Sequence, residues 1–244
     1  RVGEAGPGET PIQPPTVCPA CGQPLVERGA HLFCMNRQTC KPQAVARLAH
    51  FAGRNAMDID TFSEKTAELL YDKLGVRDCA DLYRLTADDL LPLEGFQQKR
   101  ADNLIAALDK SRHCALDAFL FALGIPNVGR KTARDLAQHF GSLERLKSAT
   151  VEELTAIPDV GDIVATSVVE FFSFPENLEM IRRLLDAGVT PQHESDALSD
   201  ALAGKTVVVT GTLPTLSRDE AEALIARHGG RAASSVSKKT SFVL

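Results

Sequence analysis

The segment IPNVGRKTA at residues 125–133 recurs 32 positions later as IPDVGDIVA at residues 157–165. Two more divergent copies precede them, LEGFQQKRA at 93–101 and IDTFSEKTA at 59–67, with offsets of 32 and 34 residues. Each copy opens with an aliphatic residue, has Phe or Val three positions on, and reaches an alanine eight positions after its first residue. Spacing of this length indicates a repeated supersecondary unit.

Proline and glycine lie at the centre of the last two copies, as Pro126 with Gly129 and Pro158 with Gly161. Proline cannot continue a preceding helix, and glycine can adopt positive φ without a Cβ penalty. Apolar residues follow at helical spacing in both copies. We therefore predict helix, tight turn and helix in each unit. The N–H groups at the start of the second helix would then face outward, where an anion can bind.

These turns resemble helix-hairpin-helix motifs, which bind nucleic-acid phosphates through backbone amides without reading base sequence. The first copy lacks both glycines, and the fourth is followed by Asp162, so we expect DNA contacts mainly at the second and third turns and packing at the fourth. The residues that the resemblance implies as DNA-binding are Gly95, Lys99, Arg100, Asn127, Gly129, Arg130, Lys131 and Gly161. The alternative is a helical array in which the turns only connect helices.

The charge distribution restricts how such a protein can bind nucleic acid. The net charge is −5, and residues 55–180 carry thirteen Lys and Arg against twenty-two Asp and Glu. A nucleic-acid-binding protein with an acidic central region must use local contacts, such as those of backbone amides. Aromatic residues make up only 5% of the chain and include no Trp, which argues against base stacking. No apolar run approaches the roughly 18 residues of a membrane helix, and no secretory signal opens the chain. We expect no membrane partner.

Four of the six cysteines stand close together at residues 18–40, in CPACGQPLVERGAHLFCMNRQTC. The first two form a C-x2-C knuckle, and a strand-like interval brings the second pair to it. This spacing predicts a closed structural zinc site with four thiolates rather than a disulfide framework. The predicted ligands are Cys18, Cys21, Cys34 and Cys40. His31 could replace a cysteine, but with four thiols available it is expected to be a solvated strand residue. Cys79 and Cys114 are expected to be core or surface thiols.

The last segment, residues 204–244, changes from helical to strand periodicity. A β-branched run at 205–210 predicts a buried strand, and Ser217 is a candidate N-cap for a helix at 218–228. The pair Gly229-Gly230 ends that helix, and strands are predicted at 231–237 and from residue 242.

This β-α-β-β order and the stretch GKTVVVTGTL resemble the beginning of a BRCT domain, of which about half is present. In some BRCT domains such residues hold a phosphate, which makes Thr210, Gly211 and Lys239 candidate phosphate ligands. Structural turn residues and a solvated lysine are the open alternative. A dinucleotide fold is excluded because no G-x-G-x-x-G run follows the strand.

The order of these parts resembles the C-terminal half of a bacterial NAD-dependent DNA ligase, most closely in AMDIDTFSEK, ALGIPNVG and SVSKKT. That resemblance implies a parent enzyme that adenylates its own lysine with NAD and seals nicks in replication and repair with Mg²⁺. Its adenylation and OB-fold domains would lie upstream, and no Lys-x-Asp-Gly motif occurs here. We expect a fragment with no catalytic residue and no activity of its own. It would be a monomer that binds Zn and nicked double-stranded DNA, and the resemblance implies a bacterial cytoplasmic location at the nucleoid.

The expected architecture is mainly α. A linker at 1–17 precedes a four-cysteine zinc module at 18–53 and a four-fold helix-hairpin-helix domain at 54–190. A second linker at 191–203 leads to the partial α/β BRCT domain at 204–244.

Two further classes of DNA-repair protein remain open. A helix-hairpin-helix DNA glycosylase would need an aspartate or lysine in a pocket after one hairpin, and its iron–sulfur cysteines follow the hairpins. A non-enzymatic repair scaffold could combine the same modules for tethering.

Overall fold

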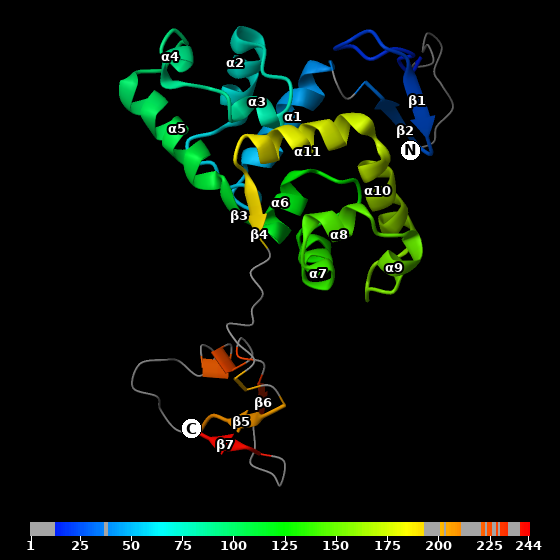
Figure 1. Ribbon diagram of the computed structural model, residues 1–244. Helices are drawn as coiled ribbons and strands as arrows, with labels where there is room; N and C mark the ends of the chain where they lie inside the picture. Colours follow the sequence, from blue (N-terminus) through cyan, green and yellow to red (C-terminus); the bar gives the residue numbers. More distant parts are fainter. Residues whose placement is uncertain are drawn as a thin grey trace, which may run out of the picture. The chain divides into compact units, whose positions relative to one another are not determined.

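The computed structural model describes residues 13–36, 39–192, 201–202, 204–210, 221–222, 224–225, 228, 230–233 and 240–244 (Figure 1). Helices dominate this part of the chain and the strands are short. The chain divides into two compact units, Arg1–Ser111 with Glu176–Gly188 and Arg112–Pro175 with Val189–Leu244. The helical region predicted at 54–190 is therefore shared between two units, with two of the four repeats in each.

The first unit begins with a two-stranded antiparallel hairpin and continues as helices. The hairpin pairs β1 (Leu25–Arg28) with β2 (His31–Cys34). The helices are α1 (Lys41–Ala52), α2 (Glu64–Leu74), α3 (Cys79–Leu82), α4 (Ala87–Leu90), α5 (Gln98–Ser111) and α11 (Pro175–Asp186), nearly all of which belongs to this unit. Phe51 and the buried leucines of these helices, among them Leu48, Leu70 and Leu104, form the core.

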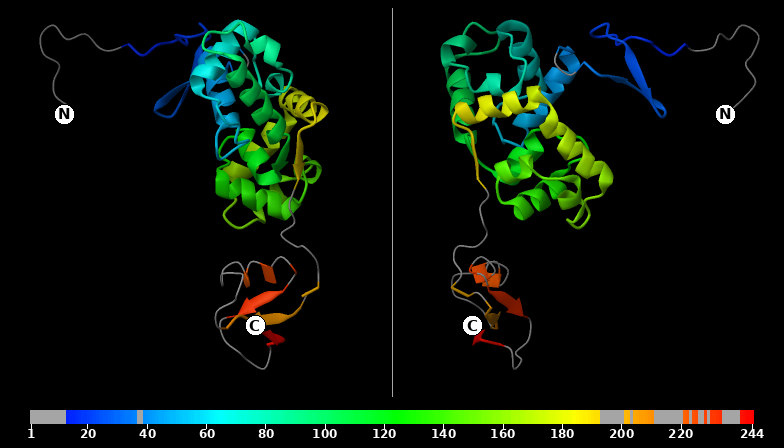
Figure 2. Two further views of the ribbon diagram at one scale, coloured as in Figure 1. Left: turned by 90° about the vertical axis from the view of Figure 1, so that its left-hand side faces the viewer. Right: turned by 45° about the vertical axis from the view of Figure 1, so that its right-hand side comes forward.

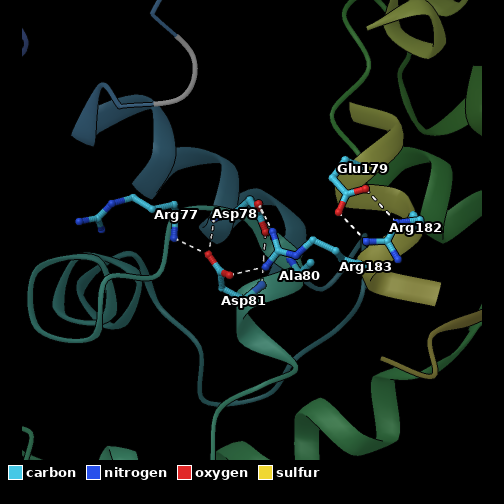
Figure 3. A network of polar contacts seen from close by, with 7 residues as sticks. All are labelled: Arg77, Asp78, Ala80, Asp81, Glu179, Arg182 and Arg183. Atoms are coloured by element: carbon cyan, nitrogen blue, oxygen red, sulfur yellow. Dashed lines mark hydrogen bonds and ion pairs between the residues drawn. The ribbon is translucent and has the colours of Figure 1, made fainter. Parts of the chain in front are cut away.

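Helix α11 is tied to α3 by one arginine, although more than a hundred residues separate them in sequence. Arg183 donates through Nη1 to Asp78 Oδ2 over 2.8 Å and through Nη2 to Asp81 Oδ1 over 2.5 Å (Figure 3). The same carboxylates also cap α3, because Asp78 accepts from Ala80 N–H and Asp81 accepts from the N–H groups of Arg77 and Asp78. Removing Arg183 would leave two half-buried carboxylates without their cation.

The second unit contains the third and fourth repeats between two short strands. Its helices are α6 (Leu116–Ala122), α7 (Arg130–Phe140), α8 (Leu143–Lys147), α9 (Val151–Thr155) and α10 (Asp162–Ser173). Strands β3 (His113–Ala115) and β4 (Thr190–Gln192) pair in parallel. Pro191 and Gln192 were expected in the linker; they lie instead in β4, because pairing with β3 satisfies their backbone.

All four repeats have the same backbone geometry. Their first and ninth residues are buried in every copy: Ile59, Ala67, Leu93, Ala101, Ile125, Ala133, Ile157 and Ala165. The third residue has a φ between 63° and 76°, and the N–H of the fourth donates to the carbonyl of the first over 3.1–3.4 Å. Positive φ at the third position of such a bond is the pattern of a type II turn. The ninth N–H donates to the fifth carbonyl and starts the next helix.

Our expectation that the glycines of the last two turns take positive φ is wrong. Gly129 has φ −88° and Gly161 has φ −90°, which any residue can adopt. The positive φ lies at Asn127 and Asp159 instead. Asn and Asp tolerate the left-handed conformation better than most residues, so they serve the turn where Gly95 does so in the second copy.

The C-terminal segment contains a parallel sheet in the order β6-β5-β7, drawn in orange and red in Figure 2. The strands are β5 (Thr206–Val208), β6 (Arg231–Ala233) and β7 (Phe242–Val243). Val207, Val209, Ala221 and Ile225 form its buried cluster. A Cβ at Gly230 would lie 2.9 Å from side-chain atoms of Ile225 and Leu202, so only glycine fits there. Ser217 and Gly229 lie outside the described residues.

Candidate metal centre and nucleic-acid interface

The four predicted ligand cysteines come together at one point. Their sulfur atoms all lie within 4.8 Å of one another. The Sγ atoms of Cys18 and Cys40 are 4.0 Å apart, and those of Cys21 and Cys34 are 3.5 Å apart. Tetrahedral zinc with Zn–S bonds of about 2.3 Å requires S···S separations of about 3.8 Å. The cluster is therefore compatible with one closed zinc site.

Three local structures hold these cysteines. A tight turn places Cys18 and Cys21, with Gly22 N–H donating to the Cys18 carbonyl over 2.8 Å. Cys34 ends β2, and Cys40 is the N-cap of α1. Gln43 on α1 donates through Nε2 to the Cys34 carbonyl over 3.0 Å, which links the hairpin to the helix.

The thiols differ in acidity. Backbone N–H groups of Ala20 and Cys21 lower the pKa of Cys18 to about 7, which favours the thiolate that binds metals. The backbone N–H of Asn36 lowers the pKa of Cys34, but burial and the neighbouring thiols outweigh it and raise that pKa to about 12. Metal binding requires all four thiols to lose their protons, and a bound cation would compensate the charge of the four thiolates.

Among the described residues, His31, Cys79 and Cys114 do not belong to the cysteine cluster. His31 packs its ring edge-on against Phe33, with ring centroids 6.2 Å apart. Burial raises the pKa of Cys79 above its ordinary value and that of Cys114 to about 12, so both thiols stay protonated and unreactive.

The third and fourth turns lead into helices that have no side-chain cap. Neither Gly129 before α7 nor Gly161 before α10 has an N-cap hydrogen bond from a side chain. A Cβ at either glycine would point into open space. The backbone at both turns is therefore accessible to a ligand, and at the third turn Arg130 and Lys131 are exposed beside it.

Two contacts that the sequence did not predict join these turns. Lys131 Nζ lies 2.5 Å from Asp159 Oδ2, so a residue of α7 pairs with the fourth turn. Asn127 of the third turn donates through Nδ2 to Ser167 Oγ on α10 over 2.8 Å. Lys131 lowers the pKa of Asp159, and Asp159 raises the pKa of Lys131. Arg134, also on α7, lies 3.9 Å from Asp117.

The second turn has a different environment. A shallow hollow beside it is lined by Gly95, Gln97, Lys99, Arg100 and Asn103. Arg100 donates to the Gly95 carbonyl over 2.9 Å and lies over the Phe96 ring, 4.2 Å from its centroid. The Arg100 guanidinium therefore braces the turn, while the Lys99 side chain is exposed.

The first turn is capped by its own side chain. Ser63 Oγ accepts from the N–H of Thr66 over 3.2 Å. One of the N–H groups that an anion would use is therefore already bonded. This agrees with the expectation that DNA contacts lie mainly at the second and third turns.

The candidate phosphate ligands of the C-terminal segment are only partly described. Thr210 donates through both its N–H and its Oγ1 to the main-chain oxygen of Leu244, over 2.6 and 3.1 Å. Gly211 and Lys239 lie outside the described residues. Among the described helices, none has both the length and the apolar character that crossing a bilayer requires.

Three family models match the chain along most of its helical and C-terminal length. A SAM-like helix-hairpin-helix tandem matches residues 57–110, and a helix-hairpin-helix motif matches 118–181. A BRCA1 C terminus (BRCT) domain matches 198–244. The predicted fold class is therefore confirmed: mainly helical, with tandem helix-hairpin-helix segments, a BRCT region and a cysteine cluster.

Curated relatives extend this agreement over nearly the whole chain. A DNA ligase of Clostridium perfringens (strain ATCC 13124) is 52% identical over 238 residues, which are 97% of this chain and 36% of that protein. The chain is homologous to DNA ligases. A DNA ligase of Alkaliphilus metalliredigens is 49% identical over 234 residues, or 96% of this chain and 36% of the relative. The chain thus spans about a third of the length of the DNA ligases that it matches, and the resemblance to the C-terminal part of a DNA ligase is confirmed.

Proposed function

We propose that this chain is the C-terminal part of an NAD-dependent DNA ligase and that it holds nicked duplex DNA without reading base sequence. The main support for this proposal comes from the third turn. It combines an uncapped helix start, a glycine whose missing side chain leaves the backbone open, and two exposed cations. Backbone N–H groups at such a helix start suit a phosphate, which has the same charge at every base pair.

The second and fourth turns would contribute less to DNA binding than the third. At the second turn Lys99 adds a cation, and Arg100 supports the backbone at Gly95. At the fourth turn Asp159 and Asp162 oppose a phosphate, so Gly161 contributes an open backbone without a cation. The residues proposed to contact DNA remain those of the sequence analysis, with the third turn as the principal contact.

We propose zinc as the metal of the four-cysteine cluster, with a structural role. Four sulfur donors leave no open position for a substrate. Because Cys40 is the N-cap residue of α1 and Lys41 pairs with Glu68 and Asp72 of α2, zinc would fix the hairpin to the helical part of its unit. NAD and Mg²⁺ belong to the parent enzyme, whose adenylation and OB-fold domains would supply the chemistry of nick sealing. The fragment alone would be inactive and monomeric, and the parent would act on the bacterial nucleoid.

The decisive experiment measures binding of this chain to nicked and intact duplexes of two unrelated sequences over a salt series. We expect binding to both sequences with equal affinity. Replacing Lys131 with Ala should reduce the slope of log K against log salt by about one. Absence of binding at low salt, or a preference for one sequence, would contradict phosphate gripping through the backbone.

A further inference from the structure

The fourth repeat differs in kind from the other three at one position. The seventh residue is Lys65, Lys99 and Lys131 in the first three copies, and all three lysines are exposed. In the fourth copy it is Ile163, whose exposed fraction is 74%. No other large apolar side chain in the described part of the chain is as exposed. A single apolar residue on a protein surface is ordinary, but Ile163 occupies the repeat position at which the other three copies have a lysine.

The contacts between the turns place Ile163 beside the third turn. Asn127 donates to Ser167 Oγ, and the Ser167 hydroxyl donates in turn to the Ile163 carbonyl over 2.9 Å. Ser167 and Ile163 are four residues apart, so their side chains lie on the same face of α10. The pair formed by Lys131 and Asp159 holds the fourth turn close to the start of α7. Ile163 therefore lies next to the contacts that join the third turn to α10.

Ile163 itself cannot bind a phosphate, because its side chain is apolar and has no hydrogen-bond donor. Asp162 precedes it and is exposed, and Asp159 lies in the same turn. Between successive phosphates, a DNA strand presents the C–H edges of its deoxyribose rings. These edges are apolar and lie within one nucleotide of the phosphate at the third turn.

We propose that Ile163 makes an apolar contact with the deoxyribose of the strand held at the third turn. This inference rests on the proposed function. It gives the two turns complementary tasks, in which the third binds a phosphate and the fourth packs against the adjacent sugar. Ile163 is then a positioning residue that adds affinity without adding an ionic contact.

Salt dependence distinguishes this contact from an ionic one. An apolar contact releases no counterions from the phosphates, whereas each lysine–phosphate contact changes the salt slope by about 0.9. For Ile163→Ala we expect binding to nicked duplex about fivefold weaker, because apolar burial equivalent to about one methylene group is lost, with an unchanged slope. For Ile163→Lys we expect the slope to increase by about 0.9, because the new cation lies within reach of the backbone.

Phe174 provides the matched control. It is the C-cap of the same helix, its exposed fraction is 52%, and it lies eleven residues from Ile163. Phe174→Ala should leave both affinity and slope unchanged. The proposal is overturned if Ile163→Ala binds like the unmodified chain, if Phe174→Ala weakens binding equally, or if Ile163→Lys leaves the slope unchanged, as expected of a residue that faces another protein. Failure of the proposed function is a separate result, since the unmodified chain would then not bind DNA.

Discussion

The third and fourth turns have nearly the same sequence up to their glycine, IPNVG and IPDVG, and nearly the same backbone. The three residues that follow differ completely: Arg130, Lys131 and Thr132 begin α7, whereas Asp162, Ile163 and Val164 begin α10. Buried residues shared by both copies specify the turn, and the exposed residues after it specify what the turn can bind. The same supersecondary unit thus supports two kinds of contact, and the following predictions test that division.

The largest effect is expected at the four-cysteine cluster, outside the third and fourth turns, when zinc is lost. Cys40→Ser removes one thiolate of four and leaves a residue suited to the N-cap of α1, so zinc bound per chain should fall from about one equivalent to near zero. Metal analysis and proteolysis of residues 18–53 would measure this change. The third and fourth turns should keep their hydrogen-exchange protection. Retention of zinc by the Cys40→Ser chain would contradict the four-thiolate site.

Overpacking the buried alanine that both repeats share should destabilise the third and fourth repeats to a similar extent. Ala133 and Ala165 are fully buried at the equivalent position, where leucine would overpack the helix against the turn. We expect Ala133→Leu and Ala165→Leu each to lower the free energy of unfolding by about 1–3 kcal/mol, measured by denaturant titration. Gln138→Leu, which adds apolar volume at an exposed position of α7, is the control and should have little effect. A large difference between the two alanines would show that the repeats do not share one packing scheme.

Altering the two glycines should separate the turns. Valine is compatible with the φ of −88° at Gly129 and −90° at Gly161, so neither Gly129→Val nor Gly161→Val should unfold the chain. Gly129→Val should weaken binding to nicked duplex about tenfold, because its side chain occupies the space through which a phosphate approaches and removes about 1.4 kcal/mol of binding free energy. Gly161→Val should have a smaller effect. Equal losses of affinity in the two variants would indicate that both turns bind phosphates.

The smallest effect concerns the ion pair between the two turns. Lys131 lowers the pKa of Asp159 below its ordinary value, so the pair contributes stability above the unfolded pKa of about 3.9 and loses it as the pH falls through the lower folded pKa. Asp159→Asn should slightly reduce Tm at pH 7, and the difference from the unmodified chain should shrink below about pH 4. Both side chains are exposed, which keeps the effect small. A Tm difference independent of pH would assign it to the turn conformation instead.

Local sequence patterns were sufficient for much of this molecule. The repeat spacing identified all four turns, because each turn is made by residues no more than nine positions apart. The spacing of Cys18, Cys21, Cys34 and Cys40 likewise identified the cluster, since only their convergence explains four thiols in so short a segment. The glycines were the exception: composition suggested positive φ at Gly129, but the turn places it at Asn127, a residue type with the same tolerance.

Contacts between distant segments were decided only by the tertiary structure. Arg183 meets Asp78 and Asp81 across more than a hundred residues, and Lys131 meets Asp159 across 28. The sequence itself contained the seventh-position lysines and their replacement by Ile163. That this exposed side chain stands beside the third turn depends on how α7 and α10 pack. Periodicity reports which face of a helix is buried, whereas the neighbour of an exposed residue depends on the packing of whole elements.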